Sequence, residues 1–74
     1  MTRTILDTNL LTWEVYASGG PSDRPSIVFN CLSNRMIRPR FVPAEGDEAD
    51  AERVVVEASN EKLQEMLSRA AELS

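Results

Sequence analysis

The sequence predicts an α+β fold in which a small antiparallel sheet of three to four strands precedes one C-terminal helix that packs on one face. Three observations support this prediction. Stretches of alternating apolar and polar residues come first, segments rich in Gly, Pro, Ser and Asp separate them, and a helical apolar stripe ends the sequence. With 74 residues, the chain is expected to form one domain, residues 1–74, around one modest core.

Three strands are expected, each with the period-two pattern of a strand that buries one face. They cover residues 11–17, 27–32 and 36–42, and the expected loops cover residues 18–25 and 43–52. Pro39 cannot donate a hydrogen bond to a neighbouring strand, so the third strand is expected to lie at an edge or to carry a bulge. The buried face is expected to carry Trp13, Val15, Ile27, Phe29, Cys31, Ile37 and Phe41.

Parity decides the turn between the second and third strands, because directly opposed residues in an antiparallel pair lie on the same face. A three-residue turn sets Ile27 against Phe41 and keeps the apolar face intact, whereas a two-residue turn sets Ile27 against Arg40. We therefore expect a turn at residues 33–35, which places Arg38 and Arg40 on the outward face.

The C-terminal segment predicts two further elements. The valine-rich residues 53–57 are expected to form a short fourth strand. A helix extended backwards is the alternative, but the five-residue step from Ala58 to Leu63 breaks its phase. Residues 60–73 are expected to form the helix, with Ser59 or the following asparagine as its N-cap.

The chain has one cysteine and no histidine, which limits the chemistry that it can perform. A zinc site made of Cys and His ligands cannot form within one chain, and a thiol nucleophile has no imidazole to activate it. We therefore expect no catalytic residue, no metal and no cofactor. Polar residues interrupt the N-terminal apolar run, so no secretory signal is expected and the predicted location is the cytoplasm.

Residues 4–11 resemble the first strand of the PIN-domain nucleases, in which an aspartate at the end of an apolar strand binds the catalytic divalent metal. By that resemblance, Asp7 would be a metal ligand in a nuclease. The pattern ends at residue 12, so residues 1–10 are interpreted as a flexible or edge-pairing segment in which Asp7 is a turn or cap residue.

One helix can cover only one face of the sheet, so the opposite face is expected to expose apolar side chains. This candidate interface comprises Tyr16, Val28, Leu32, Met36 and Val42. We therefore expect a small non-catalytic binding or accessory protein that contacts a protein partner or forms a homodimer through the open face or an edge strand. Alternatively, residues 4–11 fold back over this face. No contact with a membrane is expected.

Three arginines form the one basic cluster of the sequence. Arg35, Arg38 and Arg40 could bind phosphates or other oxyanions, and Tyr16 could stack on a base. The formal net charge of -4 disfavours a nucleic-acid partner. The alternative function is therefore an oxyanion-binding or nucleic-acid-binding module, and the structural alternative is that these arginines are solvated or lie against the acidic loop.

Overall fold

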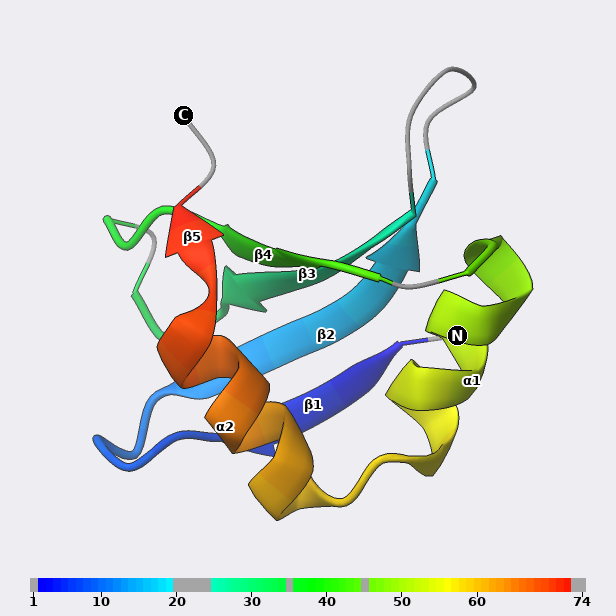
Figure 1. Cartoon of the computed structure of the whole chain (residues 1–74). Helices are drawn as coiled ribbons and strands as arrows, with labels where there is room; N and C mark the ends of the chain where they lie inside the picture. The colour runs from blue at the N-terminus through cyan, green and yellow to red at the C-terminus, as the bar shows by residue number, and fades with distance from the viewer. Residues whose placement is uncertain (1, 20–24, 35, 45, 73–74) are drawn as a thin grey trace.

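The structure is a computed structural model that describes residues 2–19, 25–34, 36–44 and 46–72. Five strands, β1 (Arg3–Leu6), β2 (Thr12–Ser18), β3 (Ser26–Cys31), β4 (Arg40–Pro43) and β5 (Ala71–Glu72), form one antiparallel sheet in sequence order. Two helices, α1 (Glu48–Glu57) and α2 (Asn60–Arg69), connect β4 to β5 and contribute to one core with the sheet (Figure 1). The expected antiparallel α+β arrangement is confirmed, but the expectation of one helix is wrong.

The N-terminal residues form the edge of the sheet. β1 pairs with β2, and this register sets Ile5 against Trp13. Of the two expectations for residues 1–10, edge pairing is therefore the one that the structure shows for Arg3–Leu6. This segment does not fold back over the open face of the sheet.

The valine-rich segment 53–57, expected as a strand, is the second half of α1, and the expected loop 43–52 contains its first half. The helix begins at a capping box in which Asp47 and Asp50 accept each other's backbone N–H. Gly46 precedes it with φ +86°, and a Cβ there would lie 2.1 Å from the Asp50 carboxylate. These local signals outweigh the β-propensity of three consecutive valines.

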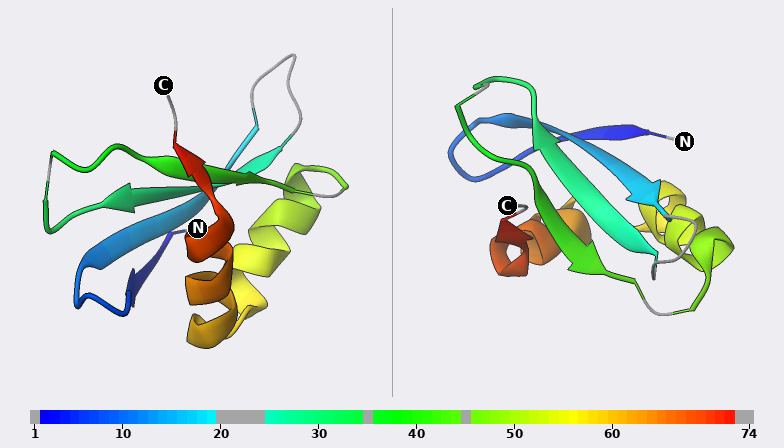
Figure 2. Two further views of the ribbon diagram at one scale, coloured as in Figure 1. Left: turned by 60° about the vertical axis from the view of Figure 1, so that its left-hand side comes forward. Right: turned by 90° about the horizontal axis from the view of Figure 1, so that it is seen from above.

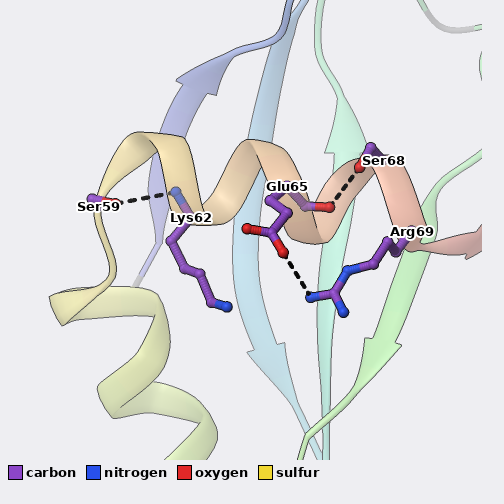
Figure 3. A network of polar contacts seen from close by, with 5 residues as sticks. All are labelled: Ser59, Lys62, Glu65, Ser68 and Arg69. Carbon is purple, nitrogen blue, oxygen red and sulfur yellow. Dashed lines mark hydrogen bonds and ion pairs between the residues drawn. The ribbon is translucent and has the colours of Figure 1, made fainter.

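The phase break at Ala58 is real, but it separates two helices and not a strand from a helix. Ala58 has an extended conformation, and the Ser59 hydroxyl then caps α2 by accepting from the backbone N–H of Lys62 (Figure 3). α2 ends at Arg69, earlier than the expected 60–73, because Ala70 is extended and Ala71–Glu72 pair with β4.

The core lies between the helices and one face of the sheet. The register sets Trp13 against Cys31 and Val15 against Phe29, so these side chains share that face. The helices add buried residues to the same cluster, and α1 contacts β2 and β3 whereas α2 contacts β1 and β4 (Figure 2). The buried core cluster comprises Ile5, Trp13, Val15, Ile27, Phe29, Cys31, Ala51, Val55, Leu63, Met66 and Leu67.

The register of β4 differs from the parity prediction by one residue. Ile27 faces Val42 and Val28 faces Phe41, so Val42 packs against the core and Phe41 lies on the opposite face. The same shift places Arg40 opposite Phe29 on the core face. The expected positions of Phe41, Val42 and Arg40 are therefore wrong, because a one-residue change of register exchanges the two faces.

The connection between β3 and β4 explains this shift. The expected strand over residues 36–42 is reduced to β4, because residues 36–37 form a turn and Pro39 cannot join a ladder. Asn34 holds the turn: its side-chain oxygen accepts from the N–H of Met36, and its carbonyl accepts from the N–H of Ile37. The expected three-residue turn is replaced by a longer connection, which we call the loop 32–39 and whose residue 35 lies outside the described residues.

Arg3 ties the edge strand to the junction of the helices. Its guanidinium donates to the carbonyl oxygens of Val55 (3.1 Å) and Ala58 and to Oδ1 of Asn60 (2.6 Å). A cation at this position stabilises the C-terminal end of α1, whose own last turn has no basic residue. None of the helices in the described ranges is both long and apolar enough to cross a membrane.

Candidate functional site

The five residues of the expected interface do not form one surface. Tyr16 and Val28 face each other on the sheet face opposite the helices, whereas Val42 lies on the core side. Leu32 is exposed just beyond β3, and Met36, 89% exposed, lies in the loop 32–39. The structure therefore divides the expected set between the open face, the core and one end of the sheet.

The open face has one central apolar row. Tyr16, Val28 and Phe41 lie side by side on β2, β3 and β4, and Ala71 of β5 extends the row. Val28 is only 6% exposed, because its cross-strand neighbours flank it on both sides, while Tyr16 and Phe41 are half-buried. No helix in the described part of the chain packs on this row.

A pocket lies between α2 and the end of the sheet that carries the turn 7–11 and the loop 32–39. We call it the arginine pocket. Its volume is about 730 Å³, and it is lined by Asp7, Thr8, Asn9, Leu11, Trp13, Met36, Ile37, Arg38, Arg40, Gln64, Leu67 and Ser68. The pocket thus joins residues from three separate parts of the sequence.

Arg40 occupies the sheet side of this pocket. Its guanidinium carbon lies 5.7 Å from the centre of the Trp13 ring, within the range of a cation–π interaction. Its Nε is buried and has no hydrogen-bond partner. None of the hydrogen bonds and ion pairs found among the described residues involves the Arg40 side chain, so within that part of the chain its half-buried charge has no bonded counter-charge.

Asp7 organises another part of the pocket lining. One carboxylate oxygen accepts from the backbone N–H groups of Asn9 (2.7 Å) and Leu11 (2.9 Å), and the other accepts from Nε1 of Trp13 (2.8 Å). The interpretation of Asp7 as a turn residue is confirmed. Among the described residues Asp7 forms no ion pair with Arg40, and the three N–H groups occupy most of its acceptor positions.

The same contacts keep Asp7 ionised. Burial raises the pKa of Asp7, but the three hydrogen bonds and the positive charge of Arg40 outweigh that effect, so its pKa lies below the ordinary value. Asp7 is therefore a fixed negative charge at neutral pH. It partly offsets the positive potential of the pocket without bonding to either arginine.

The other two members of the basic cluster lie on the same connection. Arg38 is exposed and lines the arginine pocket beside Met36, so the structure brings Arg38 and Arg40 to one site. Arg35 lies outside the described residues. Tyr16 is on the other face of the sheet from Arg40, so it is not the stacking partner that was expected for these arginines.

The grouping of Asp7, Trp13 and Arg40 was not predicted from the sequence. One signal pointed to part of it, because a buried tryptophan requires an acceptor for its indole N–H, and Asp7 was the nearest carboxylate in a turn. Within the described ranges, no group of three or more His, Cys, Asp or Glu side chains is arranged to hold a metal ion.

No protein-family model, curated protein or solved structure matches this chain.

Proposed function

We propose that this is a small non-catalytic binding protein and that its arginine pocket holds an oxyanion. The observation that carries the proposal is the half-buried guanidinium of Arg40, whose Nε is buried without an acceptor. A charge that is partly removed from water without a bonded partner costs free energy. A bound oxyanion that accepts from Nη1 and Nη2 would offset the cost of the charge, although Nε itself stays buried. Asp7 forms no ion pair with Arg40 among the described residues, and three N–H groups already occupy most of its acceptor positions.

The ligand is better interpreted as a small anion than as a nucleic acid. Stacking of bases requires an accessible aromatic face beside the cationic groups. Trp13 is 2% exposed, and Tyr16 lies on the opposite face of the sheet. The formal net charge of -4 also opposes long-range attraction of a polyanion.

An anion titration at constant ionic strength tests the proposal. We expect phosphate, sulfate and acetate to shift the backbone amides of residues 36–40 and the Trp13 indole N–H in an amide correlation spectrum. Arg40→Gln should abolish the shifts, whereas Arg53→Gln, which removes an exposed arginine of α1 outside the pocket, should retain them. Equal shifts in the wild type and Arg40→Gln, or no shifts with any anion, would refute the proposal.

The open face supports a second candidate function, which is self-association or contact with a protein partner. The supporting observation is the row of Tyr16, Val28 and Phe41, against which no helix of the described chain packs. An apolar surface between polar margins is typical of an interface, and symmetric homodimers are the commonest oligomers.

Sedimentation equilibrium over a wide concentration range tests this candidate. We expect a dimer mass for the wild type and a monomer mass for Tyr16→Lys and for Phe41→Lys. The control Val56→Lys changes an exposed apolar residue of α1, away from the row, and should leave the mass unchanged. A monomer mass at every concentration would exclude self-association.

A further inference from the structure

We infer that the arginine pocket selects an organic monocarboxylate with an apolar body. This inference rests on the proposed oxyanion site and adds the chemical class of its ligand. It follows from three properties of the pocket: its apolar wall, its local charge and the donors that Arg40 leaves available.

The apolar wall lies directly beside the arginines. The accessible part of this wall comes from the half-buried Leu11 and Ile37 and the exposed Met36, whereas Trp13 and Leu67 line the pocket but are already almost fully buried. A pocket of about 730 Å³ is far larger than an inorganic anion needs. An anion with a hydrocarbon body would cover this wall, whereas phosphate or sulfate would leave it in water.

The local charge fits one negative charge. Arg38 and Arg40 contribute two positive charges, and the ionised Asp7 contributes one negative charge, so the lining carries a net charge of +1. The carboxylate of a monoanion would balance it. A dianion would place an excess negative charge near Asp7, where the half-buried setting weakens screening by water.

The donors of Arg40 fit a planar acceptor. Because its Nε is buried, Nη1 and Nη2 are the guanidinium groups left for a ligand. The contact with Trp13 restricts the orientation of the guanidinium plane. A carboxylate can accept from two such N–H groups in one plane, and the exposed Arg38 can add a second cationic contact.

The experiment is a titration of the intact protein with a homologous series of carboxylates, followed by the fluorescence of Trp13, the one tryptophan of the chain. The probes are acetate, butanoate, hexanoate, hexylamine and inorganic phosphate. We expect the affinity to rise about threefold to fourfold for each added methylene. Hexylamine should not bind, and phosphate should bind no more tightly than acetate.

Single variants test the arginines and the apolar wall of the pocket separately. Arg40→Gln should lower the affinity for every carboxylate by tenfold or more. If Arg40→Gln does not fold, Arg38→Gln, which changes an exposed arginine of the pocket, should also lower the affinity for every carboxylate. Met36→Ser should lower the affinity for hexanoate but leave the affinity for acetate unchanged. The matched controls are Arg53→Gln and Leu6→Ser, which lie outside the pocket and should change no affinity.

The outcomes distinguish this inference from the proposed function. If no anion binds, both fail. If phosphate and acetate bind but the affinity does not increase with chain length, the oxyanion site stands and the inferred ligand class is wrong. If hexylamine binds as tightly as hexanoate, or phosphate binds more tightly than every carboxylate, the selection for a monocarboxylate is refuted.

Discussion

At the scale of the single residue, Asp7 joins a turn to the core tryptophan. Asparagine in its place could still accept from the backbone N–H groups of Asn9 and Leu11, but its amide would face Nε1 of Trp13 donor to donor. We expect Asp7→Asn to lower the free energy of unfolding by about 1 to 3 kcal/mol at neutral pH, because a largely buried donor loses its acceptor. Urea denaturation measures this change.

The difference in free energy of unfolding between the wild type and Asp7→Asn should depend on pH in one direction. Because the pKa of Asp7 is lowered in the folded state, its carboxylate stabilises the fold above its ordinary pKa of 3.8. That contribution is lost as the pH falls through the folded pKa, so the difference should shrink in acid. In a protein that already carries Trp13→Phe, Asp7→Asn should lower the free energy of unfolding by a smaller amount. Equal decreases with and without Trp13→Phe would show that the indole hydrogen bond does not cause the destabilisation.

Leu10 occupies a backbone position that suits glycine. Its φ is 64°, and it closes the turn by donating from its N–H to the carbonyl of Asp7, while its side chain is 79% exposed. We expect Leu10→Gly to raise the free energy of unfolding by about 0.5 to 1 kcal/mol, because relief of the left-handed conformation exceeds the added freedom of the unfolded chain.

Thermal denaturation of Asn9→Gly provides the control for Leu10. Asn9 has no positive φ, so glycine there adds freedom to the unfolded chain without relieving strain, and stability should fall by about 0.4 to 1 kcal/mol. Stabilisation by both glycines, or by neither, would contradict the interpretation that Leu10 is strained.

At the scale of the element, the start of α2 depends on one serine. The Ser59 hydroxyl accepts from the N–H of Lys62, whereas the Ser68 hydroxyl donates back to the carbonyl of Glu65 (Figure 3). We expect Ser59→Ala to cost about 0.5 to 2 kcal/mol in denaturant unfolding, because an N-terminal N–H loses its acceptor. Ser68→Ala should be close to neutral, since the carbonyl that it bonds belongs to the helix ladder.

The same figure shows the ion pair between Glu65 and Arg69, with 3.7 Å between the charged atoms and both side chains well exposed. Exposed pairs at this spacing contribute little to stability.

If Ser68→Ala destabilised the protein as much as Ser59→Ala, the distinction between the capping hydroxyl of Ser59 and the hydroxyl of Ser68, which donates to a helix carbonyl, would be wrong.

At the scale of the whole molecule, the register of β4 assigns the two phenylalanines to different layers. Phe29 is 0% exposed in the core, whereas Phe41 is half-buried on the open face. We expect Phe29→Ala to lower the free energy of unfolding by about 3 to 5 kcal/mol and to leave this small domain largely unfolded. Phe41→Ala should cost about 1 kcal/mol. Circular dichroism during urea titration tests the difference, and equal losses would favour the register predicted by parity.

Part of the candidate site could be predicted from the sequence. The basic cluster identified Arg38 and Arg40, and Asp7 was interpreted as a turn residue. Their association with Trp13 could not be predicted, because Arg40 lies on the core face only as a consequence of the register of β4. The open-face row was anticipated at Tyr16 and Val28, and Phe41 joins it for the same reason.

The sequence by itself determined the elements whose local signals agree. Alternation fixed the faces of β2 and β3, because successive side chains of a strand point to opposite sides, and the apolar stripe with its N-cap fixed α2. The tertiary structure decided the valine segment and the position of β4. Three valines favour a strand locally, but the capping box and the burial of Ala51 and Val55 favour a helix. Register depends on which residues of distant strands meet, and that is set by packing of the whole core.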